Sequence, residues 1–159
     1  MDSAARVVTA LEDLGARYEV IEIDPDFADT AAFCAKYGYP LEVSGNTIIV
    51  ASRREPVQYS ACLVKASTRL DVNRAVRKLM GVRKLSFATP EQTMALTGMA
   101  IGGVTPLALP HEVPIYVDEK VMQLDYVILG SGSRSSKIRV SPDALRGIPN
   151  TQVVAGLSV

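Results

Sequence analysis

Stretches with the residue pattern of strands alternate along this chain with stretches typical of helices, and several of the strands are separated only by short turns. The pattern predicts helices over residues 3–15, 29–37, 71–81, 89–98 and 141–147, and strands over residues 18–23, 46–51, 57–64, 84–88, 114–117, 126–129, 137–140 and 152–154. Antiparallel neighbours can be joined by a tight turn, whereas parallel neighbours need a long crossover. We therefore expect a mixed α/β fold with a central, mostly antiparallel mixed sheet surrounded by helices.

Residues suited to helix ends mark the starts of three predicted helices. Ser3 is expected to cap the first helix, and Asp71 the third. The run Thr89-Pro90-Glu91-Gln92 combines an N-cap threonine, a proline at the first helical position and a glutamine three residues after the cap. This run therefore predicts a sharply defined helix start at residue 89.

The predicted helix over residues 71–81 has one apolar and one basic face. Its apolar residues recur at i, i+3, i+4 and i+7, which leaves Arg74, Arg77 and Lys78 outside. The chain carries 17 basic and 17 acidic residues, but residues 51–90 hold a basic excess. Overall neutrality argues against a dedicated nucleic-acid binder, whereas a local basic face is enough to attract a phosphate backbone. The face is either such a contact or an ordinary solvated surface.

Length and composition are those of a globular protein of one domain. The chain has 159 residues, 48% of them hydrophobic and 21% charged, which suits a single domain over residues 1–159. Its N-terminal residues are amphipathic and unlike a signal peptide, and no apolar stretch is long enough to span a bilayer. Cys34 and Cys62 stand apart from any ligand-like spacing. We expect reduced, buried thiols in a cytoplasmic protein without a membrane partner.

No self-sufficient catalytic group stands out in the sequence. His111, the one histidine, has no nucleophile or orienting acid nearby, which favours a surface loop residue over a catalytic base. No group of Cys, His or carboxylate residues has metal-ligand spacing, and we expect neither a metal nor another cofactor. The glycine-rich run 130–134 lacks the Gly-Lys-Ser/Thr ending of a P-loop, so it is either an anion-binding loop or a turn between two strands. An enzyme built on this chain needs a substrate that is already reactive.

Several motifs, taken in order, resemble one known family. Residues 97–109 read Thr-Gly-Met-Ala-Ile-Gly-Gly-Val-Thr-Pro-Leu-Ala-Leu, with Gly102 and Pro106 in a Gly-x-x-x-Pro arrangement. This stretch is similar to the glycine–proline loop of the YbaK-like aminoacyl-tRNA deacylases, whose fold is also the editing domain of bacterial prolyl-tRNA synthetases. The strand ending at Asp118, the glycine-rich turn at 128–134 and the helix start at 141–145 also resemble that family. The likeness extends over roughly residues 15–155.

The resemblance implies hydrolysis of mischarged aminoacyl-tRNA in trans, without metal or cofactor. An aminoacyl ester is already activated, so its hydrolysis depends more on the placement of water and carbonyl than on a strong protein nucleophile. In the family the terminal ribose hydroxyl takes part, and a backbone carbonyl of the glycine loop orients the substrate. The resemblance gives that position to Gly102. It also implies aminoacyl-tRNA and an aminoacyl-tRNA synthetase as partners. The outward basic face of the helix over residues 71–81 makes Arg74, Arg77 and Lys78 the candidate tRNA-binding residues.

The chain departs from the family at the family's best-known side chain. The family strand begins Lys-Thr/Ser-Leu-Val, whereas this strand begins Asn46-Thr47, so an amide stands where the lysine is expected. An amide keeps hydrogen-bonding capacity but carries no charge. Lys65, at the expected end of the neighbouring strand, is a candidate to replace the lysine in space, and Lys137 is basic where some relatives carry an acid. The candidate catalytic residues are Gly102 and Asn46, and the candidate substrate-binding residues are Thr47, Gly103, Pro106, Lys65, Ser131 and Gly132.

Two other interpretations of the sequence stay open beside the deacylase. In one, the same pocket binds an aminoacyl-tRNA end or an amino-acid-like ligand, and turnover is lost together with the lysine. In the other, the apolar wall of the pocket serves protein–protein interaction. If the resemblance holds, Asn46, Thr47, Gly102, Gly103 and Pro106 converge on one concave pocket. The enzyme and the binding module then differ in whether a cation lies beside Asn46 and the Gly102 loop.

Overall fold

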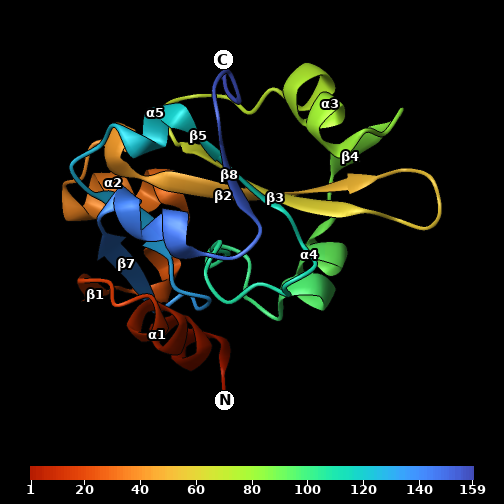
Figure 1. Ribbon diagram of the computed structural model, residues 1–159. Helices are drawn as coiled ribbons and strands as arrows, with labels where there is room; N and C mark the ends of the chain where they lie inside the picture. The colour runs from red at the N-terminus through yellow and green to blue at the C-terminus, as the bar shows by residue number, and fades with distance from the viewer.

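The computed structural model describes residues 1–159, in which helices surround two β-sheets (Figure 1). The α-helices are α1 (Ser3–Asp13), α2 (Thr30–Tyr37), α3 (Arg77–Met80), α4 (Pro90–Thr97) and α5 (Glu119–Met122). Short 3₁₀-helices lie at η1 (Pro25–Phe27), η2 (Leu41–Val43) and η4 (Pro142–Gly147), and a π-helical turn, η3 (Val72–Val76), leads into α3. The strands are β1 (Tyr18–Glu22), β2 (Gly45–Ser52), β3 (Tyr59–Lys65), β4 (Leu85–Phe87), β5 (Ile115–Asp118), β6 (Val127–Gly130), β7 (Ser136–Val140) and β8 (Thr151–Val154).

The strands are divided between a three-stranded and a five-stranded sheet. The smaller sheet has the order β1-β7-β6 and is antiparallel throughout. The larger has the order β4-β2-β3-β5-β8, with antiparallel pairs at β4-β2 and β2-β3 and parallel pairs at β3-β5 and β5-β8. The mixed α/β fold is thus confirmed, although we expected the strands in one central sheet. A parallel bridge between Ser44 and Ile128 connects the two sheets.

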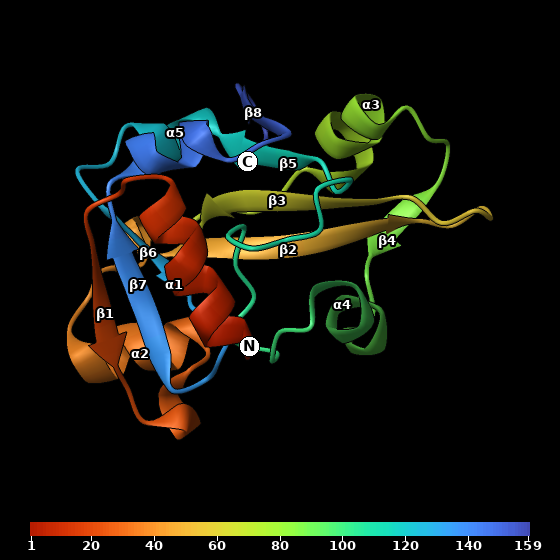
Figure 2. The same cartoon turned by 60° about the horizontal axis from the view of Figure 1, so that its bottom comes forward.

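The main hydrophobic core lies where both sheets and α1 come together. Its 16 buried residues include Val7 and Leu11 from α1, Leu63 from β3 and Ile138 from β7. A second cluster lies beneath η3 and α3, and a third surrounds Phe33 of α2. Figure 2 shows α1 in front of β7 and the long β2–β3 hairpin reaching away from this core. The core therefore fixes the base of the hairpin, on which the candidate site is built.

The predicted helix starts are local features, and most of them form. Thr89 and Gln92 make both hydrogen bonds of a capping box at α4, and Asp71 caps η3 through the backbone N–H of Arg74. The expected cap of α1 by Ser3 is wrong, because Asp2 accepts the bond from the N–H of Ala5. Ser3 lies one residue inside the helix, where its hydroxyl donates to the carbonyl of Gly98 at 2.5 Å.

Two further findings concern the cysteine thiols and the helices. Cys34 and Cys62 are both buried and unpaired. Burial raises the pKa of the Cys62 thiol to about 12, so that it remains protonated at neutral pH. None of the helices combines the length and the apolar character that a membrane crossing requires.

One half of β2 has a free edge, and this edge positions the site. On one side β2 pairs with β3 along most of its length, from Gly45 to Ala51. On the other side β4 pairs with β2 only over Val50–Ser52, and the N–H of Ala88 adds one bond to the carbonyl of Ile49. The edge from residue 45 to 48 therefore has no paired strand, although the bridge between Ser44 and Ile128 brings β6 close to its start. Backbone groups on such an edge can bind another molecule.

Candidate active site

A loop over residues 99–106, called the glycine loop below, packs its backbone directly against the turn between β6 and β7. The N–H of Gly132 donates to the carbonyl of Gly103 at 2.7 Å, and the N–H of Ala100 donates to the carbonyl of Gly132 at 3.2 Å. A Cβ atom at Gly103 would lie 2.5 Å from the carbonyl oxygen of Ser133 and 2.7 Å from its nitrogen. Only glycine permits this approach, which explains the residue type at position 103.

A cavity of about 290 Å³ opens between the free edge of β2, the glycine loop and β7. Its wall combines backbone-rich segments with a few polar side chains and an apolar rim on which Phe87 and Ile101 are exposed. Such a mixture is typical of sites that bind small molecules. The lining residues are Thr30, Gly45, Asn46, Thr47, Ile48, Ile49, Phe87, Ala88, Thr93, Ile101, Gly102, Val104, Gly130 and Lys137.

Lys137 places a positive charge in the wall of this cavity. Its side chain is only 6% exposed, and its Nζ donates to the carbonyl of Ala28 at 2.6 Å and to that of Gly102 at 2.9 Å. The Nζ also lies 5.7 Å from the centre of the Phe33 ring. An ammonium has three N–H donors, so one remains beyond the two carbonyl bonds. Lys137 thus both holds the glycine loop and retains a donor for a ligand.

Burial and neighbouring charges act in opposite directions on the protonation of Lys137. Desolvation lowers the pKa of Lys137 below its ordinary value, and the nearby Arg134 guanidinium acts in the same direction, whereas the carboxylate of Asp29 raises that pKa. The two carbonyl acceptors favour the charged form as well. Lysines with a lowered pKa in a cavity occur often at functional sites.

Arg134 ties the same two segments together a few residues earlier. Its guanidinium donates to the carbonyls of Ile101 at 2.8 Å and Pro25 at 2.9 Å, and it pairs with Asp29 at 3.2 Å. The Asp29 side chain is 72% exposed, so the ion pair itself contributes little to stability. The two carbonyls are held mainly by hydrogen bonds from the planar guanidinium, and the ion pair with Asp29 adds little. Arg134 and Lys137 therefore clamp the glycine loop against the segment between η1 and α2.

Two neutral side chains of β2 complete the polar part of the cavity. The Asn46 carbonyl oxygen accepts a hydrogen bond of 2.8 Å from the hydroxyl of Thr30, so the amide nitrogen remains free to donate. The Oγ1 atom of Thr47 is buried and has no hydrogen-bond partner. A buried hydroxyl without a partner is uncommon and costly, and the hydroxyls of Thr105 and Thr151, outside this cavity, are in the same state.

The structure brings some of the predicted site residues together and separates others. Asn46, Thr47 and Gly102 line one cavity. Gly103 lies behind the loop against Ser133, and Pro106 lines a different hollow. Lys65 stands opposite Gly45 in the β2–β3 pair, Ser131 donates to the carbonyl of Ser136 inside the turn, and Gly132 packs against Ser3, so these three do not line the cavity.

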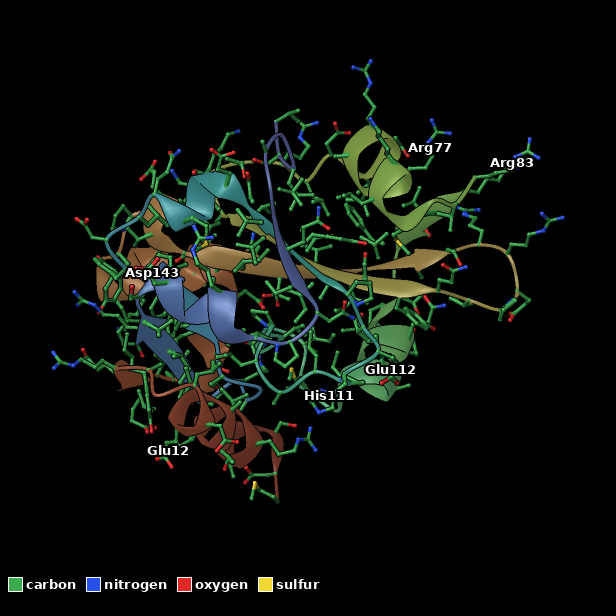
Figure 3. All side chains as sticks on the ribbon, in the orientation of Figure 1. Glu12, Arg77, Arg83, His111, Glu112 and Asp143 are labelled. Atoms are coloured by element: carbon green, nitrogen blue, oxygen red, sulfur yellow. The ribbon has the colours of Figure 1, made fainter.

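The remaining predicted residues lie far from this cavity. Arg74, Arg77 and Lys78 are exposed on η3 and α3 at the other end of the β2–β3 hairpin. Figure 3 shows Arg77 reaching into solvent from α3, while His111 lies at the opposite edge of the molecule. His111 is exposed in a turn, in agreement with a surface loop residue. The glycine-rich run 130–134 forms the turn between β6 and β7, as one of its two interpretations predicted.

Comparison with known proteins assigns the family. The sequence matches the aminoacyl-tRNA editing domain over residues 24–148, which include β2, the glycine loop and the Lys137 strand. The chain belongs to the aminoacyl-tRNA editing domain family. The resemblance found in the sequence motifs is thereby confirmed.

One of two similar curated proteins is named for deacylation, and the other is named as uncharacterized. The chain is 25% identical over 105 residues to the "Putative Cys-tRNA(Pro)/Cys-tRNA(Cys) deacylase EbsC" of Enterococcus faecalis, covering 66% of this chain and 62% of the relative. It is 30% identical over 93 residues to the "Uncharacterized protein YwhH" of Bacillus subtilis, covering 58% of each protein. The alignments thus span about three fifths of the length of these relatives.

Solved structures extend the likeness over almost the whole chain. A crystal structure titled "putative trans-editing enzyme for prolyl tRNA synthetase" has a TM-score of 0.81 and 28% identity, and covers 98% of this chain and 96% of that one. A hypothetical protein superposes with a TM-score of 0.85 at 23% identity, covering 97% of this chain and 99% of that one, and shows the fold alone. The editing-domain fold is therefore shared beyond the matched sequence segment.

Sequence reasoning did not identify the lysine that lines this cavity. It proposed Lys65 in place of the family lysine, whereas Lys137 is the lysine that lines the cavity. The available signal was a lysine within an apolar strand pattern, where the neighbours Ile138 and Val140 enter the core. Thr30 and Arg134 were missed as well, because residues at helix starts and turns carry no pattern that separates function from structure.

Proposed function

We propose that this chain hydrolyses the ester bond of mischarged aminoacyl-tRNA in trans. One observation carries the proposal: a single cavity joins the carbonyl side of the glycine loop, the amide of Asn46 and the buried ammonium of Lys137. Membership of the aminoacyl-tRNA editing domain family supports the substrate class. The relative named as a putative deacylase and the solved structure titled as a putative trans-editing enzyme support the reaction type.

The reaction needs placement more than a protein nucleophile. Water adds to the ester carbonyl carbon, the bond from that carbon to the ribose oxygen breaks, and the ribose oxygen takes up a proton. The products are a free amino acid and a tRNA with a free terminal ribose. The neighbouring ribose hydroxyl is held beside the ester by its own chain, which gives it the high effective concentration of an intramolecular group. It can therefore help to activate or orient the water.

The cavity residues take distinct roles in this proposal. Lys137 supplies the positive charge for the oxygen that becomes negative as water adds, through the donor that its carbonyl bonds leave free. The Asn46 amide donates to the substrate from the position where the family lysine stands. The carbonyl of Gly102 accepts from Lys137 and keeps a second lone pair for the substrate.

The aminoacyl group and the terminal adenosine of the substrate need different surroundings, and the apolar rim of the cavity differs from its polar interior. Phe87 is 58% exposed and Ile101 is 41% exposed at the edge of the cavity. Exposed aromatic rings stack nucleic-acid bases, at about 1–3 kcal/mol per base. We assign the rim to the adenine and the interior to the aminoacyl group.

The test compares two forms of the tRNA end. A panel of mischarged tRNAs ending in normal adenosine is incubated with the protein, and active substrates are remade with a 2′-deoxy terminal adenosine. We expect hydrolysis of at least one normal substrate, a large loss with the deoxy form and no effect of a metal chelator. Equal hydrolysis of both forms, or loss of activity on chelation, contradicts the mechanism.

A binding module is the second candidate function, and one contact favours it. The Lys137 ammonium already binds two carbonyls, so part of its charge is committed to holding the glycine loop. The cavity then recognises an aminoacyl-tRNA end without turning it over. Measurable binding of mischarged tRNA with no hydrolysis across the panel identifies this function and excludes the deacylase.

A further inference from the structure

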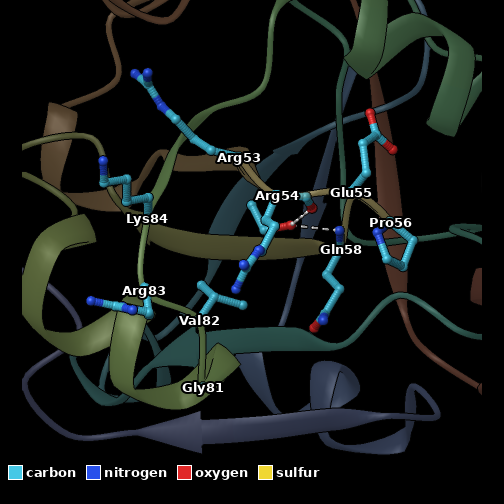
Figure 4. Close-up of a pocket in the computed structure, with 10 residues that line it drawn as sticks. Arg53, Arg54, Glu55, Pro56, Gln58, Gly81, Val82, Arg83 and Lys84 are labelled. Atoms are coloured by element: carbon cyan, nitrogen blue, oxygen red, sulfur yellow. Dashed lines mark hydrogen bonds between the residues drawn. The ribbon is translucent and has the colours of Figure 1, made fainter.

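A second and larger hollow lies at the far end of the β2–β3 hairpin. It encloses about 720 Å³ between the turn that joins β2 to β3 and the segment that joins α3 to β4 (Figure 4). Only one of its ten lining residues is hydrophobic, and none is aromatic. The hollow, called the arginine cleft below, is therefore built for a polar ligand without a base or ring to stack.

Four cationic side chains surround the arginine cleft without acidic partners. Arg53, Arg54, Arg83 and Lys84 are exposed, and none of them forms an ion pair. In Figure 4 the charged ends of Arg53, Arg83 and Lys84 extend to one side of the cleft, and Arg54 lies within it beside Val82. The one acid of the cleft, Glu55, turns its carboxylate to the opposite side. Unpaired like charges around one cleft repel each other, so a bound anion stabilises them.

Backbone hydrogen bonds hold the two walls of the arginine cleft together. The N–H of Arg53 donates to the carbonyl of Lys84 at 3.0 Å, which joins the hairpin turn to the start of β4. The Ser52 hydroxyl accepts from the N–H of Gln58 at 2.8 Å and shapes the same turn. The cationic groups therefore stand on a fixed backbone, as an anion site requires.

The arginine cleft and the candidate active site lie at the two ends of one strand pair. Ile49 and Phe87 line the active-site cavity, whereas Ser52 and Lys84 line the cleft. The three residues from Ile49 to Ser52 span about 10 Å of extended strand. A polyanion whose end enters the cavity can therefore reach the cleft within a few backbone units.

We infer that the arginine cleft binds consecutive phosphates of the tRNA whose aminoacyl end occupies the cavity. The inference rests on the proposed function and adds a site to it. Arginine binds phosphate oxygens through its planar fork of donors, and the absence of an aromatic lining favours the backbone over the bases. Because phosphates carry no sequence information, the cleft orients the tRNA without selecting its sequence.

The experiment measures binding of uncharged tRNA as a function of salt concentration. The variant Arg54→Gln/Arg83→Gln removes two cleft charges. As a matched control, Arg17→Gln/Lys36→Gln removes two exposed charges that form no ion pair at the other end of the molecule. We expect the cleft variant to bind about tenfold more weakly near 0.1 M salt, with the slope of log affinity against log salt reduced by about one to two. The control should stay within about twofold of wild type.

The outcomes separate the cleft from the catalytic proposal. Equal weakening in the cleft variant and in the control means that net charge alone acts, and it overturns the inference, as does unchanged binding in the cleft variant. If no mischarged tRNA is hydrolysed but uncharged tRNA binds through the cleft, the deacylase proposal fails and the cleft stands. If mischarged tRNA is hydrolysed and the cleft variant binds like wild type, the deacylase stands and the cleft fails.

Discussion

At the scale of single residues, the most informative side chain is Lys137. It brings a positive charge into the cavity that Asn46 also lines, and Asn46 is the residue that stands where the resemblance leads us to expect a lysine. Both residues line the same cavity, on different strands of different sheets. A cation stabilises a reacting oxygen by its position, so a lysine on another strand can do the same when it reaches the same point in the cavity. We interpret the pair as a relocated charge.

A charge swap tests this relocation. We expect Lys137→Asn to lower the single-turnover rate of ester hydrolysis by about 100-fold or more, the size of effect seen when one stabilising donor is removed. Asn46→Lys added to Lys137→Asn should restore part of the rate, because it returns the ammonium to the family position. Asn46→Lys alone should bring no gain, since two ammoniums then repel each other in one cavity.

Lys137→Arg is the control for the swap, since it keeps the charge but changes the donor geometry. The thermal unfolding temperature of every variant shows whether the fold remains stable without the bond from Lys137 to the glycine loop. Wild-type rates in Lys137→Asn, with an intact fold, contradict the role of this lysine.

The lowered pKa of Lys137 also predicts how stability changes with pH. Between the lowered folded-state pKa and the ordinary value of 10.5, the unfolded chain binds more protons than the folded chain. The free energy of unfolding contributed by this residue therefore rises with pH across that window and has no slope below it. Urea unfolding of wild type and Lys137→Met, measured from neutral to alkaline pH, isolates the effect, because all other groups are shared. A constant difference between the two proteins across this range contradicts the shift.

At the scale of elements, the glycine loop and the β6–β7 turn act as one unit. Gly103→Ala places a Cβ against backbone atoms of Ser133, which cannot move aside as a flexible side chain can. We expect a loss of about 1–3 kcal/mol in the free energy of unfolding, measured by urea denaturation, together with lower activity from a displaced Gly102 carbonyl.

Gly147→Ala is the matched control for the loop variant. The added Cβ meets only the end of the Leu14 side chain, at 2.9 Å, and that side chain can turn away. Its cost should be clearly smaller than that of Gly103→Ala. Equal costs, or unchanged activity in Gly103→Ala, show that the loop and the turn are not coupled.

Helix starts and strand positions were largely predictable, because they depend on neighbours within a few residues. The capping box at Thr89 and the cap at Asp71 formed as expected. The site was predictable only in part. Asn46 and Gly102 came from motifs, but the bond from Lys137 to Ala28 joins residues 109 positions apart, and the pattern of one strand cannot reveal such a partner. The division into two sheets was missed for the same reason, since it depends on which strands pair at long range.

At the scale of the whole molecule, the fold turns a basic stretch of sequence into one basic end. Residues 51–90 include the hairpin turn, η3, α3 and β4. These elements lie together at the end of the molecule opposite α1 and α2. The neutral total of 17 basic and 17 acidic residues conceals this separation of charge. A field of this kind attracts and orients a polyanion before contact.

The last prediction concerns the exposed face of α3 beside the arginine cleft. Arg74, Arg77 and Lys78 are exposed and make no ion pair, so each is available to a phosphate. If tRNA runs from the cavity through the cleft onto α3, reversing these three charges to Glu should weaken tRNA binding and lower the salt slope by about 0.7–0.9 for each phosphate that is no longer bound. Their effect should add to that of the cleft variant, because separate phosphate-binding groups act independently.

Reversal of Arg17, Lys36 and Arg146 supplies the control for α3, with the same change of net charge at exposed sites on the other end of the molecule. Direct binding of a phosphate and a long-range field differ in what they change. Removing a phosphate-binding side chain lowers the salt slope and speeds dissociation, whereas weakening the field mainly slows association. If reversal on α3 slows association as much as the control does and leaves dissociation unchanged, α3 only steers the tRNA. If binding and slope do not change at all, the α3 face is a solvated surface, and the tRNA path ends at the cleft.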